Sequence, residues 1–158
     1  MKFEPDTSPL PHGFDIEHLD DDAVAVARRA ISIACDSDYL YVATHHLLLS
    51  LLEYDSAQGD GIFGGFSLST NEFKNQMLRI DPPGEPTIHF KLPTTTPLWN
   101  CYLHGIVLAT AKNRLANPVD IYDGLLHNRE SPVDMILHAL GIEISTNHKL
   151  ELKHPKTP

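Results

Sequence analysis

The sequence predicts an all-α protein in which two four-helix repeats form a pseudo-two-fold pair. Three observations predict this fold. Apolar residues recur along several segments at the i, i+3, i+4 spacing of amphipathic helices. Residues that commonly begin helices stand directly before these segments. The same order of caps and apolar positions returns in the second half of the chain, as it does in proteins built from internal repeats.

The first half contains three strong helix signals. A helix is expected at residues 19–37, where three aspartates near its start stabilise the positive end of the helix dipole. Thr44 is expected to cap a second helix at residues 45–54, which is apolar almost all round, as buried helices are. Residues 59–65 contain four glycines and predict at most a short, distorted helix, since each interior glycine costs about 1 kcal/mol relative to alanine. A Ser-x-x-Glu capping box opens a helix at residues 69–80.

A proline-rich linker is expected between the two halves. Four prolines fall between residues 81 and 96, and proline interrupts both helices and central strands. Ile88, Phe90 and Leu92 alternate with polar residues inside the linker. This alternation allows a short extended segment within residues 87–92.

The second half begins three helices with proline, a residue favoured at the first helical position. These starts are Thr96-Pro97, Asn117-Pro118 and Ser131-Pro132. The third helix should end at Gly141, because glycine readily adopts the left-handed conformation that terminates helices. Ser145 is expected to cap a last short helix that frays by Lys153.

The two halves repeat along the sequence at a nearly constant offset. Leu51-Leu52 matches Leu125-Leu126 at an offset of 74, and Ser69-Thr70-Asn71 recurs as Ser145-Thr146-Asn147 at an offset of 76. Each unit is too small to bury its apolar surface alone, so the two should pack face to face and leave a groove between them. The expected organisation is a flexible arm at 1–18, a first repeat at 19–80, the linker at 81–96, a second repeat at 97–152 and a disordered tail at 153–158.

Charge and composition exclude several classes of function. Twelve Lys and Arg residues against 21 Asp and Glu give a net charge of −9, which repels the phosphates of nucleic acids and of anionic membranes. No segment approaches the roughly 20 apolar residues of a membrane span, and the first residues do not form a secretory signal. Cys35 and Cys101 fall in apolar helical segments and are expected to be buried thiols. We therefore expect a cytoplasmic protein that binds neither nucleic acid nor membrane.

Catalytic, metal and nucleotide motifs are missing from the sequence. His45 and His46 are adjacent, and neighbouring positions on a helix point about 100° apart, so their side chains do not converge on one metal ion. The chain contains no His-x-x-x-His, no Cys-x-x-Cys and no G-x-x-x-x-G-K-[ST] phosphate loop. We expect no enzyme activity, no catalytic residues, no metal and no cofactor.

Short motifs in both halves are similar to those of a known family. The run Thr44-His45-His46-Leu47-Leu48-Leu49 is the most specific, and the second half carries Thr96-Pro97, Pro118, Leu125-Leu126 and Leu140-Gly141-Ile142. At these positions the chain resembles the amino-terminal domain of Clp-type AAA+ unfoldases, over about residues 19–152. The resemblance implies two helical repeats that together form a module for binding substrates, adaptors or degradation tags.

The resemblance implies a non-catalytic protein- or peptide-binding module without the ATPase. Such a module would act as an adaptor, a decoy or a regulator in Clp-type protein unfolding and degradation. Its partner would be a Clp unfoldase, a protease subunit or a client protein, and no oligomeric state is predicted. The alternative is an interaction module that reuses the same fold in an unrelated pathway, since a fold can persist while its site changes.

The expected ligand site lies at two equivalent helix starts, because helix N-termini present unpaired N–H groups to carboxylates, phosphates or peptide carbonyls. Its residues are Thr44, His45, Pro118 and Val119, with Trp99 as a wall of the groove. Some family members bind phosphoarginine through a glutamate placed where this chain has His45 and Val119. Neither residue can pair with a guanidinium. We therefore expect a preference for apolar or weakly acidic peptides, with a pH dependence if His45 is exposed.

Overall fold

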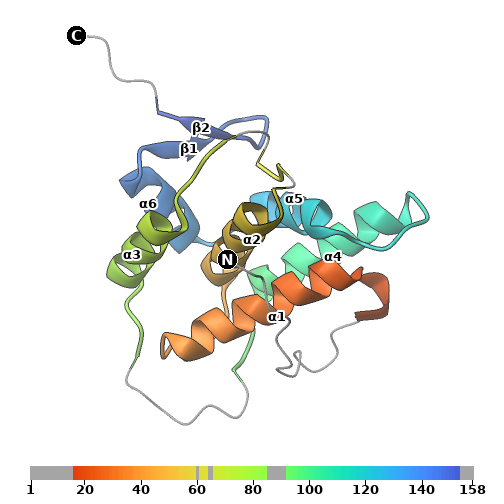
Figure 1. Cartoon of the computed structure of the whole chain (residues 1–158), viewed down its shortest axis with the longest axis horizontal. Helices are drawn as coiled ribbons and strands as arrows, with labels where there is room; N and C mark the ends of the chain where they lie inside the picture. The colour runs from red at the N-terminus through yellow and green to blue at the C-terminus, as the bar shows by residue number, and fades with distance from the viewer. Residues whose placement is uncertain (1–15, 60, 64–65, 85–91, 154–158) are drawn as a thin grey trace.

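Within the described residues the chain forms six α-helices and one β-hairpin (Figure 1). This computed structural model describes residues 16–59, 61–63, 66–84 and 92–153. The helical fold class predicted from the sequence is confirmed. The elements are η1 (Ile16–His18), α1 (Asp21–Asp36), α2 (Thr44–Gln58), α3 (Thr70–Ile80), α4 (Thr96–Thr110), α5 (Pro118–Asn128), α6 (Ser131–Ala139), β1 (Ile142–Ile144) and β2 (Leu150–Leu152).

Helix starts lie where the sequence predicts them, although three caps are shifted by one residue. Ser69 and Asn117 are N-caps as predicted, and their side chains accept backbone N–H groups at 3.3 and 3.0 Å. At α2, α4 and α6 the caps are instead Ala43, Thr95 and Glu130. Ala43 has no capping side chain, so other groups must satisfy the first N–H groups of α2.

The two halves share an unusual backbone conformation after their first long helix. Asp38 follows α1 with a φ of 61°, and Asn113 follows α4 with a φ of 54°. Aspartate and asparagine are among the few residues that adopt this left-handed conformation readily. In both loops the N–H of the next residue donates to a carbonyl in the preceding helix, at 2.9 and 3.1 Å. The two loops are therefore structural equivalents, one in each repeat.

Two parallel β-bridges join one half to the other. Leu19 pairs with Ala116, and Val42 pairs with Thr94. Val42 in the first half corresponds to Ala116 in the second, and Leu19 corresponds to Thr94. Exchanging the two halves therefore turns one bridge into the other. Each bridge contains two hydrogen bonds of 2.8–3.0 Å. This reciprocity supports the predicted pseudo-two-fold relation between the repeats.

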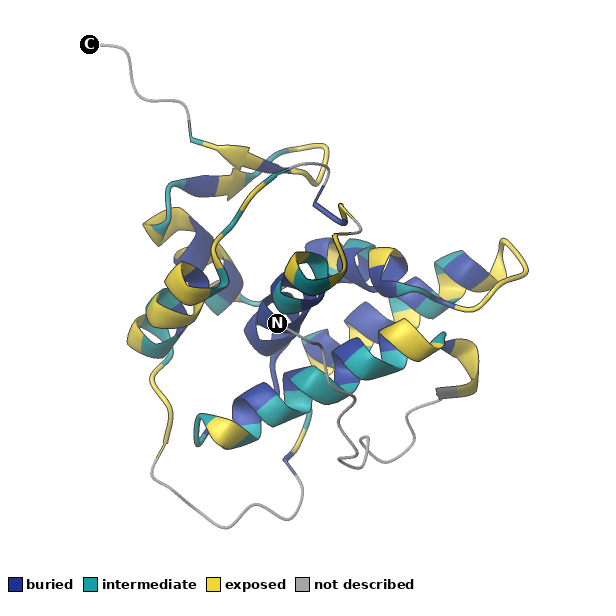
Figure 2. Ribbon diagram, in the orientation of Figure 1, coloured by how far each residue is buried: buried dark blue, intermediate teal, exposed yellow. Residues whose placement is uncertain are grey.

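The core is built around α2, which contacts each of the other five α-helices. Residues 43–52 are all buried (Figure 2), which explains why this helix is apolar almost all round. Leucines from both repeats are buried in this core, whereas Ile106 on α4 is only half-buried. The buried leucines are Leu47, Leu48, Leu51, Leu52, Leu125, Leu126 and Leu137.

The prediction of a helix after Ser145 is wrong, because a β-hairpin forms there. Residues 142–144 and 150–152 each alternate apolar and charged side chains, and they pair as antiparallel strands. Ser145 closes the turn: its N–H donates to the carbonyl of Lys149 at 2.8 Å, and its hydroxyl accepts the N–H of Lys149 at 3.2 Å. The hydrogen bonds of Ser145 thus close a turn instead of capping a helix. Each half consequently has three α-helices among the described residues.

The glycine-rich segment forms no helix in its described part, where Ile62 and Phe63 make a turn. Residues 1–15 of the arm predicted at 1–18, residues 154–158 of the tail predicted at 153–158 and residues 87–91 of the predicted extended segment lie outside the described residues. In the part of the chain that the structure describes, no helix is both long and apolar enough to cross a membrane.

Candidate functional site

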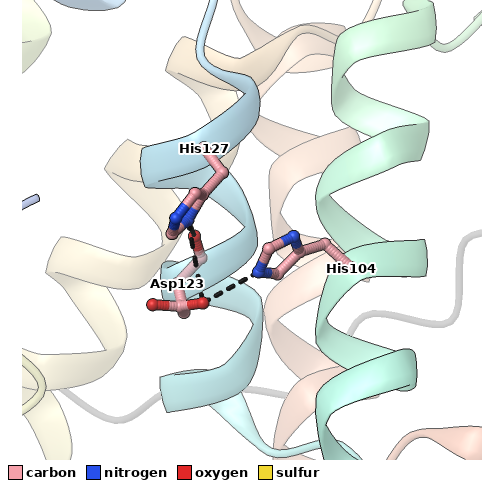
Figure 3. Close-up of side chains that lie close together, drawn as sticks. All are labelled: His104, Asp123 and His127. Carbon is pink, nitrogen blue, oxygen red and sulfur yellow. Dashed lines mark hydrogen bonds and ion pairs between the residues drawn. The ribbon is translucent and has the colours of Figure 1, made fainter.

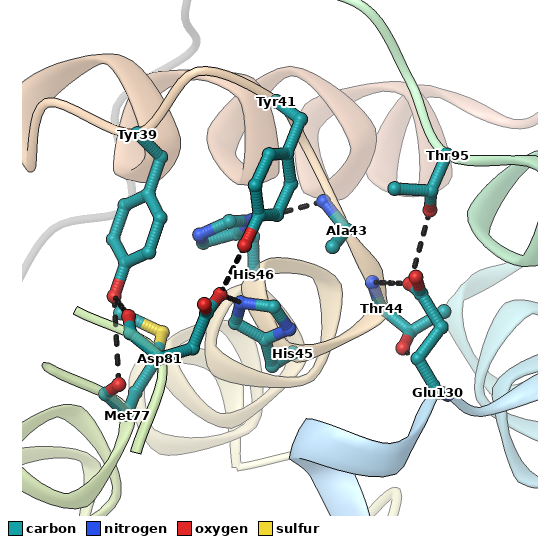
Figure 4. Close-up of polar contacts among 10 residues, drawn as sticks. All are labelled: Tyr39, Tyr41, Ala43, Thr44, His45, His46, Met77, Asp81, Thr95 and Glu130. Carbon is teal, nitrogen blue, oxygen red and sulfur yellow. Dashed lines mark hydrogen bonds and ion pairs between the residues drawn. The ribbon is translucent and has the colours of Figure 1, made fainter. Parts of the chain in front are cut away.

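The start of α2, where a ligand was expected, is occupied by the chain itself (Figure 4). Thr44 is fully buried. Its N–H donates to Oε1 of Glu130 at 2.9 Å, and the hydroxyl of Thr95 donates to the same oxygen at 3.0 Å. A carboxylate from the start of α6 therefore fills the anion-binding position that a helix N-terminus offers. Thr44 is not available to an external ligand in this arrangement.

His45 is also buried, with 1% of its surface exposed. Its Nε2 lies 2.8 Å from Oδ2 of Asp81, the residue that caps the end of α3. The hydroxyl of Tyr41 donates to the same carboxylate oxygen at 2.5 Å, and the hydroxyl of Tyr39 donates to the backbone carbonyl of Asp81 at 2.6 Å. Hydrogen bonding from His45, and then from Tyr41, lowers the pKa of Asp81. The cluster fastens the end of α3 to the start of α2.

His46 holds the backbone at the start of α2. Its Nδ1 accepts the N–H of Ala43 at 2.9 Å, so its hydrogen resides on Nε2. Burial, reinforced by the neighbouring His45, lowers the pKa of His46 to about 2. The side chain is therefore neutral at physiological pH and serves as a cap. The contacts of this cluster join the start of α2 to the end of α3, so its geometry is that of a structural joint.

The start of α5 is closed in a similar way. Asn117 and Asp120 form a reciprocal capping box, with distances of 2.9 and 3.0 Å. Arg114 forms an ion pair with the carboxylate of Asp120. Burial raises the pKa of Asp120, but hydrogen bonds from Arg114 and Asn117 outweigh it and the net shift is downward. Pro118 is buried, whereas Val119 is 52% exposed.

Of the five residues predicted as a ligand site, two keep accessible surface. These are Val119 and the half-buried Trp99. Glu130 joins Thr44 at the start of α2 to Thr95 at the start of α4. The start of α5 instead lies next to the end of η1, where Ala116 pairs with Leu19. The site predicted from helix starts is thus divided between two separate joints, each formed by contacts within the chain. The condition for a pH-dependent ligand contact, an exposed His45, is not met.

An open cavity lies elsewhere, between the glycine-rich segment, α5 and the hairpin turn. Its volume is about 470 Å³, within the usual range for ligand sites. The rings of Phe63 and Tyr122 meet edge to face in its wall, with centroids 4.7 Å apart. The lining residues are Ile62, Phe63, Phe66, Tyr122, His148, Lys149 and Leu150.

A second cavity shares part of this wall. It has a volume of about 300 Å³ and lies against the end of α2 and the residues that follow it. Phe63 and Phe66 border both cavities. Two adjacent hollows separated by aromatic side chains suit the successive side chains of an extended peptide, with the aromatic rings as anchors. We call these two hollows the Phe66 cavities.

One group of described side chains has ligand atoms that converge as a metal site requires. His104, Asp123 and His127 place one ligand atom each within 4.8 Å of one another (Figure 3). This group could not be recognised from the sequence, because His104 belongs to α4 and the other two residues belong to α5. The pair Asp123-x-x-x-His127 was the available signal, since residues four apart share a helix face.

Comparison with solved structures identifies the fold. The N-terminal domain of the caseinolytic protease associated chaperone ClpD from Arabidopsis thaliana matches with a TM-score of 0.67 and 17% sequence identity, over 80% of this chain and 89% of that one. Sixteen solved chains match significantly. No family model and no curated protein sequence matches the chain. At this identity the likeness concerns the fold. The chain therefore has the fold of a Clp amino-terminal domain.

Proposed function

We propose that the protein is a non-catalytic module that binds proteins or peptides in the manner of Clp amino-terminal domains. It would act as an adaptor, a decoy or a regulator of Clp-type protein unfolding and degradation. The observation that carries the proposal is the structural match to the ClpD N-terminal domain over 80% of this chain. The partner would be a Clp unfoldase, a protease subunit or a client. Cys35 and Cys101 are free thiols, which suits a reducing compartment such as the cytoplasm.

The Phe66 cavities are the proposed peptide site. Their walls combine three aromatic rings with the apolar side chains of Ile62 and Leu150. Lys149 and His148 supply polar groups at the same wall. Although the protein has a net charge of −9, the positive charge of Lys149 gives this wall a local preference for a carboxylate beside an apolar anchor. The site therefore suits the apolar or weakly acidic peptides expected from the sequence. Trp99 and Val119 are proposed as additional contacts.

Affinity capture with quantitative mass spectrometry tests this function. The wild-type chain should recover a Clp unfoldase, a Clp protease subunit or a client peptide from its native cell. Phe66→Asp, which puts a charge between the two cavities, should lose that partner. Leu103→Asp is the matched control, because Leu103 is an exposed apolar residue on α4 that borders neither cavity. Both variants should keep the wild-type circular dichroism spectrum.

The alternative is an interaction module of an unrelated pathway. The observation that favours it is the burial of His45 against Asp81 at the position where the family resemblance implies a ligand-binding glutamate. The same experiment separates the two functions. Reproducible recovery of a partner outside protein degradation, without any Clp component or client, would favour the alternative. Equal loss of the partner from Phe66→Asp and Leu103→Asp would reject the Phe66 cavities as the site.

A further inference from the structure

Two histidines and an aspartate face one another across the contact between α4 and α5. Nε2 of His104 lies 2.9 Å from Oδ2 of Asp123. Nδ1 of His127, one turn further along α5, lies 3.7 Å from the same oxygen. The rings of the two histidines stack with centroids 4.7 Å apart. Figure 3 shows all three side chains directed toward one space between the helices.

The hydrogen bonds of this cluster leave a lone pair for a metal ion. Nδ1 of His127 lies 2.9 Å from the backbone carbonyl of Asp123. A carbonyl can only accept, so Nδ1 carries the hydrogen and the lone pair of the neutral ring resides on Nε2. Metal-binding histidines commonly have this arrangement, in which the other ring nitrogen donates to a backbone carbonyl or a carboxylate. The ring orientation of His127 is thereby set before any ion binds.

We propose that His104, Asp123 and His127 bind a divalent transition-metal ion of the zinc type. Two imidazoles and one carboxylate are ligands that Zn²⁺ accepts, whereas Ca²⁺ and Mg²⁺ require mainly oxygen. Ligand atoms of a tetrahedral zinc ion lie about 3.3 Å apart, and here one ligand atom from each of the three residues lies within 4.8 Å of the other two. Nε2 of His104 now donates to Asp123, so metal binding requires small side-chain rotations and the transfer of that hydrogen from Nε2 to Nδ1. Three protein ligands leave the fourth position to water or to a partner's side chain.

The backbone holds these ligands close together. Gly105 follows His104, and a Cβ atom there would come within 3.0 Å of the carbonyl oxygen of Asp120. Gly124 follows Asp123, and a Cβ atom there would overlap the carbonyl group of Cys101. The two glycines let α4 and α5 approach at the level of the ligands. Sites on rigid, closely packed helices hold ligand geometry better than sites on loops.

A third histidine lies against His127. The ring of His148, in the hairpin turn, lies 4.2 Å from the ring of His127. His148 also lines the larger of the Phe66 cavities. A metal ion bound at this cluster would consequently lie beside the proposed peptide site. The metal proposal itself rests only on the three ligands and does not depend on the proposed function.

The test is isothermal titration of the metal-free full chain with Zn²⁺. We expect one ion per chain, and a dissociation constant that rises at least about tenfold in His104→Ala and in His127→Ala, since even loss of an outer-shell partner costs that much. His138→Ala should bind like the wild type, because His138 is an exposed histidine on α6 outside the cluster. In parallel, Zn²⁺ should raise the melting temperature of the wild type and of His138→Ala only.

Co²⁺ gives an independent spectroscopic readout. Its visible absorption should intensify on binding to the wild type, as expected for a low-coordinate site with imidazole ligands, and should stay weak in His104→Ala. Circular dichroism at the same concentrations verifies that each variant is folded. The proposal is overturned if the wild type binds no Zn²⁺, if the two cluster variants bind it as tightly as the wild type, or if His138→Ala loses as much affinity as they do.

Discussion

Thr44 and Glu130, one from each repeat, bind each other reciprocally. The N–H of Thr44 donates to the carboxylate of Glu130 at 2.9 Å, and the N–H of Glu130 donates to the hydroxyl of Thr44 at 3.0 Å. One residue begins α2 in the first repeat and the other caps α6 in the second. This pair links the two repeats and closes the start of α2 to outside ligands.

Removing the Glu130 carboxylate should destabilise the fold. Glu130→Ala leaves the N–H of the buried Thr44 without an acceptor, and such a loss costs about 1–3 kcal/mol. Glu130→Gln should lose less, because an amide oxygen can still accept from Thr44 and Thr95. Urea denaturation followed by circular dichroism measures both values. Equal stability of wild type and Glu130→Ala would show that this pair does not hold the repeats together.

Acid should weaken the fold through His46. Its pKa is about 2 in the folded protein and about 6.5 when unfolded, so the unfolded chain binds the extra proton between these values. The free energy of unfolding should therefore fall by up to about 1.4 kcal/mol per pH unit as the pH drops below 6.5. His46→Asn keeps an acceptor for the N–H of Ala43 and cannot take up this proton. Urea denaturation at pH 7.0, 6.0 and 5.0 should give a shallower dependence in the variant.

Asp81 contributes in a lower pH range. Its pKa is depressed by His45 and Tyr41, so its contribution is present above the unfolded pKa of about 3.9 and is lost as the pH falls further. The slope measured between pH 7 and 5 therefore reports on histidine and not on Asp81. A wild-type slope equal to that of His46→Asn throughout this interval would contradict the burial of a neutral His46.

The repeat-related leucines of the two central helices should be equally costly to truncate. Leu51 on α2 and Leu125 on α5 are 0% and 1% exposed. Each change to alanine should cost about 2–5 kcal/mol, the usual range for a buried leucine. Val107→Ala is the control, because Val107 is 68% exposed and should change stability by less than about 0.5 kcal/mol. A loss of stability below about 1 kcal/mol at Leu51 or Leu125 would show that the residue does not belong to the core.

Phosphoarginine should not bind at the start of α2. The position that would hold a carboxylate is His45, which is buried and bound to Asp81, and the neighbouring N–H groups of Ala43 and Thr44 are already satisfied. Titration calorimetry of the wild type with phosphoarginine should give no heat, whereas an apolar peptide with a terminal carboxylate should bind. Phe66→Asp should weaken the binding of that peptide, and Leu103→Asp should leave it unchanged. Tight phosphoarginine binding by the wild type would overturn this view of the joint.

Local features of the fold could be predicted from the sequence, because they depend on neighbouring residues. Ser69 and Asn117 cap helices through residues three positions later. The all-round apolar pattern of α2 marks a central helix. The hairpin was missed because Ser145-Thr146-Asn147 resembles a helix start, and each strand is only three residues long.

The joints and candidate sites could not be predicted because they depend on contacts between distant segments. Ala43 requires the ring of His46, and Thr44 requires Glu130 from the other repeat. The larger of the Phe66 cavities requires the hairpin turn as one wall. The histidine cluster joins His104 to Asp123 across two packed helices. Sequence periodicity indicates which face of a helix is buried, but it does not indicate which residues meet there.

Site-specific photocrosslinking tests the central claim most directly, that the Phe66 cavities are the binding site of a Clp-type module. A photoreactive amino acid is placed at position 66 in one variant and at position 103, on α4, in another. Crosslinked partners from the native cell are then identified by mass spectrometry. If the claim is right, a Clp unfoldase, a Clp protease subunit or a client should be crosslinked from position 66 and not from position 103. Crosslinks to such partners from position 103 alone, or none from position 66, would contradict it.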